Sequence, residues 1–290
     1  MAKEGVIYYA VGEKYLTEAT ESAESLKSNN NIHVTLFTDQ NPESNIFDNV
    51  IEVESKGSPF LDRIKCFLQS PYEKTLYMDT DTIVAGDIGP IFEMLNRFDI
   101  VARLDPFRNT AGEHWGDDQT NINVPQAFPE YQCGVFGYRD ADCIKDLFIM
   151  WEERYSEVVE TDLIDQPFFR EAVYHTDVHI GTLPSEYNLL VNNMNCLQNE
   201  AVIFHFNGGY SKDVTLPIIG TATKSQVMDK INSSYPSRRV VYPSRLGRTK
   251  VLPEPKKSLL LKLYRSLITD GVEQTVKKGV RKLINRLKPK

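Results

Sequence analysis

The sequence predicts an α/β protein with a mixed, mainly parallel sheet flanked by helices. Apolar runs typical of buried strands alternate with helical patterns as far as residue 206, and this alternation indicates the α/β class. A strand, a helix and a second strand follow one another at the start of the chain, which is the opening of a parallel sheet with a right-handed crossover. The length of 290 residues allows one large domain with a buried core, or two small ones.

The opening unit is predicted from its apolar runs and turn residues. Residues 5–11 have the composition of a buried strand, and residues 32–38 form a second strand after an asparagine-rich turn. The helix between them is expected over residues 17–28. Thr17 is a suitable N-cap for it, and acidic residues in its first turns complement the helix dipole.

The later elements follow the same pattern. Further strands are predicted at residues 75–78, 99–103, 133–138 and 200–206. Further helices are predicted at residues 60–68, 90–98, 142–158 and 165–173. The polar stretch between them at residues 105–130 has little periodicity, and a loop of that length in a compact domain is usually functional or mobile.

The alternation of strands and helices stops after about residue 210, which divides the chain into three parts. Residues 1–210 are expected to form the α/β domain, and residues 211–255 a linker or surface extension. Residues 256–290 have two helical patterns, and in the second an apolar stripe lies beside basic faces. The sequence therefore predicts a basic amphipathic helical tail.

Charge is distributed unevenly between the body and this tail. Residues 256–290 contain eleven basic and two acidic residues, a charge of +9, whereas residues 1–255 carry −16. Such a tail favours an anionic membrane surface, or alternatively the acidic domain itself, and its apolar stripe suits either better than nucleic acid.

Composition excludes several classes. A hydrophobic content of 41% with 25% charged residues is typical of a soluble globular protein. No secretory signal and no apolar run of transmembrane length is present, so we expect a cytoplasmic protein, which its basic tail could hold on the cytoplasmic face of a membrane. The four cysteines show no zinc-like spacing, which favours reduced thiols.

Two carboxylates stand at the end of an apolar strand, in the run Thr75-Leu-Tyr-Met-Asp79-Thr-Asp81. Alternate side chains of an extended segment point the same way, so Asp79 and Asp81 can face one ion. Hard divalent cations such as Mg²⁺ or Mn²⁺ prefer oxygen ligands and leave positions for water and substrate phosphates. The motif therefore indicates a metal–diphosphate site.

Six blocks of the chain carry a resemblance to a known family. They are residues 6–15, 63–65, 76–84, 131–136, 165–167 and 205–208. In order they contain the opening strand, a basic pair, Asp-x-Asp, Gly-Val, Asp-Gln and His-x-x-Gly. About the first seventy percent of the chain thus resembles the nucleotide-sugar-dependent glycosyltransferases of the GT-A fold, closest to the retaining family 8 of glycogenin and bacterial lipopolysaccharide galactosyltransferases.

The resemblance implies a set of site residues. Asp79, Asp81 and His205 would hold Mn²⁺ or Mg²⁺, and Asp165 and Gln166 would act beside the transferred sugar. Contacts to the nucleotide sugar are implied for Val11, Tyr15, Arg63, Lys65, Thr80, Gly134, Gly208 and Lys212.

The chain departs from the family at three places. Gly12 and Glu13 occupy the nucleotide-binding turn where Asp or Asn is common. Gln132 and Cys133 replace Asn and Ser in the block beside the donor sugar. Lys212 lies seven residues after the metal-binding histidine, where the family has its lysine six residues after.

The implied reaction is metal-dependent transfer of a sugar from a nucleotide sugar, expected to be a UDP-sugar, to a glycan or lipid-linked acceptor. Family 8 enzymes retain the anomeric configuration, and the leaving phosphate would then serve as base for the acceptor hydroxyl. An inverting enzyme would instead need a carboxylate base, and Asp117, Asp118 or Glu130 could supply it.

Two other functions fit parts of the sequence. A haloacid dehalogenase-type phosphatase would use Asp79 as nucleophile, with Asp117 and Asp118 as its acidic pair, but its motif normally lies on the first strand of the chain. A non-catalytic protein that binds a membrane surface through the basic tail is the other alternative, and it leaves the metal-binding pattern unexplained.

Overall fold

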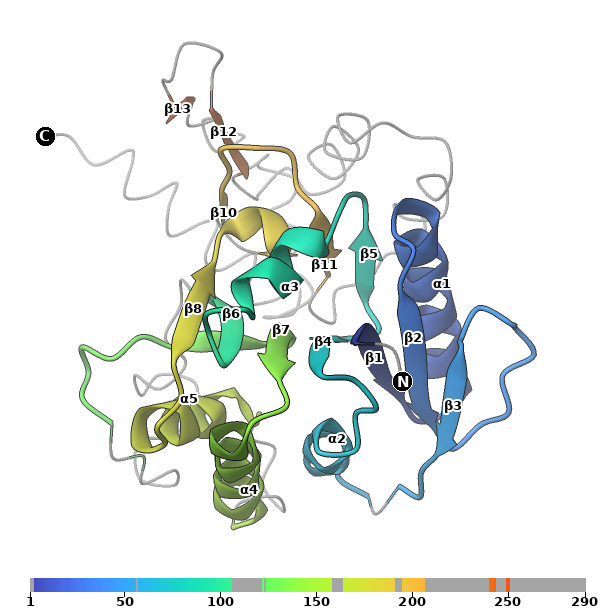
Figure 1. The fold of residues 1–290 in the computed structure, drawn as a ribbon, viewed down its shortest axis with the longest axis horizontal. Helices are drawn as coiled ribbons and strands as arrows, with labels where there is room; N and C mark the ends of the chain where they lie inside the picture. The colour runs from blue at the N-terminus through green and yellow to red at the C-terminus, as the bar shows by residue number, and fades with distance from the viewer. Residues whose placement is uncertain are drawn as a thin grey trace, which may run out of the picture.

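The computed structural model describes residues 3–55, 57–105, 122, 124–157, 164–190, 195–206, 240–243 and 249–250 (Figure 1). Seven strands form its main sheet: β1 (Glu4–Ala10), β2 (His33–Thr38), β3 (Asn49–Glu52), β4 (Lys74–Met78), β6 (Ile100–Leu104), β7 (Tyr131–Arg139) and β8 (Ile180–Leu183). They lie in the order β3-β2-β1-β4-β7-β6-β8.

Most neighbours in this sheet are parallel. Strand β1 pairs in parallel with β2 and β4, β2 with β3, and β6 with β8. Strand β7 runs antiparallel to both β4 and β6. The predicted mixed, mainly parallel sheet is therefore confirmed.

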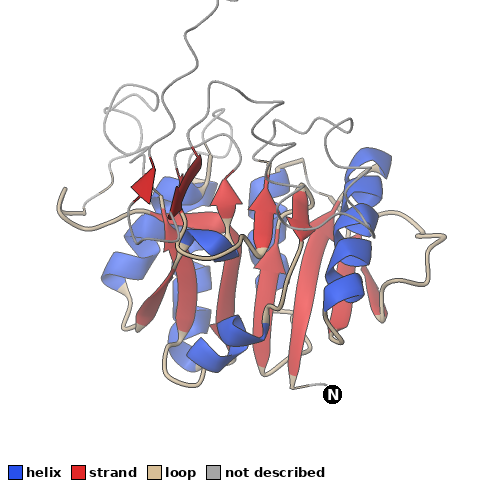
Figure 2. Cartoon of the chain, turned by 90° about the horizontal axis from the view of Figure 1, so that it is seen from above, coloured by secondary structure: helices blue, strands red, loops and turns tan. Residues whose placement is uncertain are grey.

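Helices cover both faces of the sheet (Figure 2). They are α1 (Glu13–Asn29), α2 (Pro59–Phe67), α3 (Gly89–Met94), α4 (Asp142–Ser156) and α5 (Gln166–His175), with a 3₁₀ turn, η1 (Ser185–Tyr187). Apolar residues of α2, α4 and α5 pack in one core cluster, and those of α1 and α3 pack in a second.

Strand β1 contributes to both clusters because consecutive side chains of a strand point to opposite faces. Tyr8 belongs to the cluster under α1, and its hydroxyl bonds Ser22 of that helix at 2.9 Å. Tyr9 belongs to the other cluster, on the side of α2. The two tyrosines therefore have different surroundings although they are adjacent in the chain.

Helix α1 begins at Glu13, four residues before the predicted start, and the N-cap assignment of Thr17 is wrong. The residue before the helix is Gly12, whose φ of 86° lies in the left-handed region that glycine adopts without strain. Gly12 offers no capping side chain. Thr17 lies inside the helix, where its hydroxyl donates to the carbonyl of Glu13 at 2.9 Å.

A small second sheet includes the strand that follows the Asp-x-Asp motif. It contains β5 (Thr82–Val84), β11 (Ile203–His205) and β9 (Leu189–Leu190), in the order β5-β11-β9. Strand β11 is antiparallel to β5, and Thr82 pairs with His205 in their register. This pairing brings the region of the Asp-x-Asp motif next to residues far along the chain.

The C-terminal third is described only in part. A third sheet contains β10 (Asn195–Cys196), β12 (Val240–Pro243) and β13 (Thr249–Lys250). The rest of the predicted linker at 211–255 and the whole tail at 256–290 lie outside the described residues. Within the described part, no helix has the length and apolar character that a membrane span requires.

Candidate metal and nucleotide site

The Asp-x-Asp motif occupies the step between β4 and β5. The amide of Asp79 donates to the carbonyl of Gly134 at 2.7 Å, which extends the β4–β7 pairing by one residue. The carbonyl of Asp81 accepts a hydrogen bond from the amide of Phe206 at 3.0 Å, at the end of β11. Backbone pairing on both sides therefore fixes the positions of the two carboxylates.

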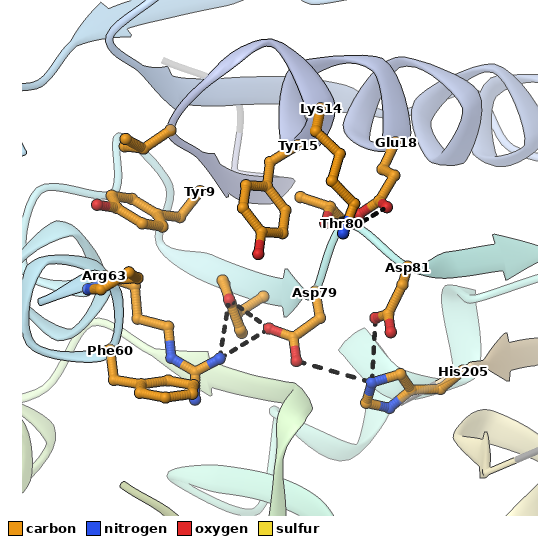
Figure 3. Close-up of a pocket in the computed structure, with 13 residues that line it drawn as sticks. Tyr9, Lys14, Tyr15, Glu18, Phe60, Arg63, Asp79, Thr80, Asp81 and His205 are labelled. Atoms are coloured by element: carbon orange, nitrogen blue, oxygen red, sulfur yellow. Dashed lines mark hydrogen bonds and ion pairs between the residues drawn. The ribbon is translucent and has the colours of Figure 1, made fainter. Parts of the chain in front are cut away.

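Three candidate ligands converge at this step (Figure 3). Nε2 of His205 lies 3.3 Å from Oδ1 of Asp81 and 3.7 Å from Oδ2 of Asp79. One ligand atom from each residue lies within 4.8 Å of the others, so the group could hold a metal ion. The structure thus brings together the three residues that the sequence analysis named as metal ligands.

The orientation of His205 suits this role. Its Nδ1 lies 3.1 Å from Oδ1 of Asn188, a fully buried residue. With an amide oxygen as acceptor, Nδ1 carries the proton, and the lone pair of a neutral imidazole is then on Nε2, facing the carboxylates. Metal-binding histidines commonly have their other ring nitrogen held in this way.

Gly134 supports the same group from behind. A Cβ placed on this glycine would lie 2.4 Å from Oδ2 of Asp79 and 2.5 Å from Cε1 of His205. Side chains cannot approach so closely, so any other residue would displace a candidate ligand. The Gly-Val block of the sequence is therefore explained by the space that the metal-ligand group needs.

The electrostatics of Asp79, Asp81 and His205 favour a bound positive charge. Burial raises the pKa of Asp79 above its usual range, although Arg63 and His205 oppose this. Burial would lower the pKa of His205, but the carboxylates of Asp81 and Asp79 raise it above its ordinary value. Two carboxylates and an imidazole fit a divalent cation such as Mn²⁺, which would replace the proton that these shifts favour.

Arg63 connects the candidate metal ligand Asp79 with the buried carboxylate of Asp165. Its Nη2 lies 2.8 and 2.7 Å from the two carboxylate oxygens of Asp165, and its Nη1 donates to Oδ1 of Asp79 at 2.9 Å. Tyr77 donates to the same oxygen of Asp79 at 2.5 Å. The ring of Phe60 lies 5.0 Å from the centre of the guanidinium. Arg63 is thus a fixed cation beside the candidate ligands.

The other predicted basic residue of this block is not brought to the site. Lys65 lies two residues further along α2, so it points to another side of the helix. Its ammonium lies 3.7 Å from Glu152 of α4, and it does not line the cavity described below.

Asp165 and Gln166 lie behind the site rather than in its open part. Asp165 is 1% exposed, and Gln166 is 5% exposed. The side-chain amide of Gln166 donates to Asp105 at 2.8 Å and to Glu130 at 2.6 Å. In this arrangement Asp165 positions Arg63, and the assignment of both residues to the sugar stays a prediction.

The two substituted residues of the fourth block face these buried groups. Gln132 donates to Asp105, and Cys133 lies 3.4 Å from Nη2 of Arg63. Burial raises the pKa of the Cys133 thiol, and Asp165 adds to this, so the thiol stays protonated. The departures from the family therefore lie beside Arg63 and Gln166.

A cavity of about 490 Å³ extends from the candidate metal ligands along β1 and α1. Its lining residues are Tyr9, Val11, Lys14, Tyr15, Glu18, Pro59, Phe60, Arg63, Tyr77, Asp79, Thr80, Asp81 and His205. Figure 3 shows the acidic group at one end and Tyr9 at the other. Below, this space is called the site cavity.

Several predicted contacts line the site cavity together. Val11 and Tyr15 come from the start of the chain and Thr80 from the Asp-x-Asp motif. The hydroxyl of Thr80 donates to Glu18 at 3.0 Å, which ties the motif to α1. Lys14 lies 4.9 Å from the centre of the Tyr15 ring and 3.7 Å from Glu18.

Sequence reasoning missed Tyr9, Phe60, Glu18 and Asn188. The first two stand in apolar runs that predict only a core strand and helix. Asn188 precedes a two-residue strand and carries no motif. Of the remaining predicted residues, Gly208 and Lys212 lie outside the described part, as do Asp117 and Asp118 of the alternatives.

No protein-family model and no curated protein matches the sequence. Solved structures match the fold. The galactosyltransferase LgtC, in complex with donor and acceptor sugar analogues, is 15% identical, with a TM-score of 0.54 over 80% of this chain and 96% of LgtC. Mouse xyloside xylosyltransferase 1 is 12% identical, with a TM-score of 0.51 over 73% of this chain and 99% of the mouse protein.

A third match is the glycosyltransferase GlyE of Streptococcus pneumoniae, which is 17% identical, with a TM-score of 0.50 over 79% of this chain and 61% of GlyE. These neighbours are GT-A glycosyltransferases. The chain therefore has the GT-A fold, as its resemblance to that group predicted.

Proposed function

We propose that the protein is a metal-dependent glycosyltransferase that takes a sugar from a UDP-sugar and transfers it, with retention, to a glycan or lipid-linked acceptor. One observation carries the proposal. On a GT-A fold, Asp79, Asp81 and His205 converge at the end of a cavity whose other walls include aromatic rings. That arrangement suits a nucleotide held by its diphosphate at one end and by its base at the other.

The residues of the site have separate tasks in this proposal. A divalent ion held by Asp79, Asp81 and His205 would supply Lewis-acid stabilisation of the leaving diphosphate. Arg63 adds a fixed positive charge beside it without further reorganisation, because Asp165 already orients the guanidinium. Tyr15 is 46% exposed at the cavity wall, where its ring can stack on a base.

Retention of the anomeric configuration is supported by the family resemblance and by the burial of Glu130. An inverting enzyme needs a carboxylate base that reaches the acceptor hydroxyl. Glu130 is 1% exposed and accepts a hydrogen bond from Gln166, so it is poorly placed for that task. The shared fold likewise favours a transferase over a phosphatase.

A screen of nucleotide sugars tests the proposed reaction. The full-length protein is incubated with UDP-, GDP-, ADP- and CDP-sugars, with Mn²⁺ or with excess chelator, and release of the nucleoside diphosphate is measured. We expect Mn²⁺-dependent release from one donor class, strongest for UDP. Release of inorganic phosphate from phosphate monoesters, with no nucleotide sugar turned over, would contradict the proposal.

The basic charge of the tail favours an acceptor that lies at a membrane surface. We propose that residues 256–290 hold the enzyme on the anionic cytoplasmic face of a membrane, since the tail carries +9 on a body of −16. Each basic residue near such a surface contributes roughly 1 kcal/mol, and the apolar stripe adds to this.

Vesicle co-sedimentation tests the tail. The full-length protein is compared with a variant in which Lys277, Lys278, Arg281 and Lys282 are serines. Binding to vesicles rich in phosphatidylserine should fall in the variant, and neutral phosphatidylcholine vesicles serve as control. If both proteins ignore anionic vesicles at low salt, the tail has another role.

A further inference from the structure

Glu18 is a buried carboxylate in the wall of the site cavity. It belongs to α1, and it is 5% exposed. Its Oε2 accepts a hydrogen bond from the hydroxyl of Thr80 at 3.0 Å. Glutamates are seldom buried to this degree unless their charge is well paired, because a carboxylate loses its hydration on burial. The position of Glu18 beside a cavity therefore calls for an explanation.

The second oxygen of this carboxylate has a weaker partner. Oε1 lies 3.7 Å from the ammonium of Lys14, which makes an ion pair but is longer than a hydrogen bond. Within the described residues, the Glu18 side chain accepts its only hydrogen bond from Thr80. Oε1 is not among the described buried atoms that lack a bond, so it keeps some exposed surface. A carboxylate has about four acceptor sites, and Glu18 can therefore accept a further donor from a ligand.

Contacts place Glu18 between an exposed aromatic ring and the candidate metal ligands. The ammonium of Lys14 lies 4.9 Å from the centre of the Tyr15 ring, and the same ammonium pairs with Glu18. Glu18 in turn bonds Thr80, the middle residue of the Asp-x-Asp motif. Figure 3 shows these side chains together above the two carboxylates of the motif. The path from the ring to the motif thus passes Glu18.

The groups of a nucleoside diphosphate follow the same order. Its ribose links the base to the diphosphate, so a nucleotide with its base on Tyr15 and its diphosphate at the metal places the ribose beside Glu18. The transferred sugar is attached to the other end of the diphosphate. Ribose offers hydroxyl donors, and a carboxylate is a strong acceptor for them. Acidic side chains bind ribose hydroxyls in dinucleotide-binding folds for the same reason.

We infer that Glu18 accepts a hydrogen bond from a ribose hydroxyl of the bound nucleotide and makes the site selective for nucleotides that carry this hydroxyl. The inference rests on the proposed function, because it takes the diphosphate to lie at the candidate metal ligands. Glu18 is not a member of that ligand group, so its effect is separable from metal binding. Lys14 balances the charge of Glu18, and the carboxylate therefore adds little repulsion toward the diphosphate.

Nucleotides that lack one hydroxyl test the inference on the unmodified protein. Binding of UDP, CDP, ADP and GDP to the full-length protein is measured by calorimetry with Mn²⁺. The tightest of the four is then compared with its 2′-deoxy and 3′-deoxy forms. The ribonucleotide should bind about ten- to hundredfold more tightly than one of the two deoxy forms, the loss expected for one hydrogen bond to a charged acceptor.

Glu18→Ala shows whether the carboxylate causes this preference. The ratio of the two dissociation constants should fall to near one in Glu18→Ala. It should stay as in the wild type in Glu24→Ala, the control, whose side chain is exposed on the same helix and does not line the cavity. A general loss of affinity cancels in the ratio. Equal losses for the ribonucleotide and its deoxy form would show that Glu18 acts only through Thr80, and would overturn the inference.

Glu18→Gln keeps the shape of the side chain and replaces the alanine variant if that variant does not fold. A neutral oxygen is a weaker acceptor than a carboxylate, so the ratio should fall in part. A ratio equal to that of the wild type would overturn the inference.

The two proposals fail in different ways. A nucleotide that binds with Mn²⁺ equally well with and without each ribose hydroxyl overturns the inference and leaves the proposed function standing. If the wild type binds none of the four ribonucleotides with Mn²⁺, both are overturned.

Discussion

The guanidinium of Arg63 binds the carboxylate of Asp165 through Nη2 and Nε, with a shortest distance of 2.7 Å. Both side chains are almost fully buried. The same guanidinium bonds Asp79, so one cation joins α2, the start of α5 and the candidate metal ligands. The stability of the fold and the geometry of the site therefore depend on the same ion pair.

Arg63→Met should destabilise the protein strongly. It leaves Asp165 buried without its cation, and breaking a buried pair in this way costs about 3–5 kcal/mol. Lys65→Met is the matched control on the same helix. It removes a partly exposed pair with Glu152, whose contribution is about 0–1 kcal/mol. Equal, small losses of unfolding free energy in both variants would contradict this account.

Gly134→Ala should damage metal binding while the protein stays folded. The added methyl group would lie 2.4 Å from Oδ2 of Asp79, so one candidate ligand must move. We expect Mn²⁺ affinity to fall by about ten- to hundredfold, the size of effect seen when ligand orientation is disturbed. Gly89→Ala is the control, since the atoms nearest to its new methyl group belong to the flexible carboxylate end of Asp87. Equal Mn²⁺ affinity in both variants would exclude the packing argument.

Asn188→Leu should weaken Mn²⁺ binding through His205. The change removes the oxygen that holds Nδ1, and loss of such a contact typically costs ten- to hundredfold in affinity. Mn²⁺ titration followed by electron paramagnetic resonance measures the effect directly. Asn49→Leu, on strand β3, is a control away from the site. An Asn188→Leu variant that binds Mn²⁺ like the wild type would show that His205 needs no such support.

Asp99 should make stability depend on acid pH. Burial alone would raise its pKa, but hydrogen bonds from the His179 amide and the Arg139 side chain bring the pKa below its usual value. A lowered folded-state pKa gives stability that is present above the unfolded value, near pH 4, and is lost as pH falls through the folded value.

Asp99→Asn tests this dependence. At pH 7 it should lower the unfolding free energy by about 2 kcal/mol, because bonds to a charged acceptor are lost. The difference from wild type should shrink below pH 4. Asp140→Asn, on an exposed loop, should change little at either pH. A constant difference between wild type and Asp99→Asn across this range would show that the Asp99 charge is not involved.

The buried elements of the fold were predictable, and the exposed or very short ones were not. Residues 5–11 gave the central strand β1 because its side chains are apolar on both faces. Strand β3 was not predicted, because it lies at the edge of the sheet and most of its residues are exposed, so it has no apolar run. The predicted start of α1 was wrong because Gly12 precedes the helix without a capping side chain. Its positive φ sets the turn, and the sequence pattern has no side-chain signal for such a start.

The site residues that belong to a sequence motif were predictable. Asp79, Asp81 and His205 were named from their order and residue types, and β5–β11 pairing brings them together. Asn188 could not be named in this way. Its role depends on which polar atom the folded chain places beside Nδ1 of His205, and that is a property of packing.

Mn²⁺-dependent binding of UDP by the wild type and by Asp81→Asn tests the central claim most directly. Asp81 is a candidate ligand, whereas Asp87 is not part of this group and accepts a hydrogen bond from the amide of Gly89, so Asp87→Asn is the control. The account predicts that Asp81→Asn loses at least about a hundredfold in UDP affinity with Mn²⁺, because a neutral amide replaces the anionic carboxylate that faces the ion. Asp87→Asn should bind like the wild type. UDP binding that is equal in all three proteins, or unaffected by removal of Mn²⁺, would contradict the metal–diphosphate site.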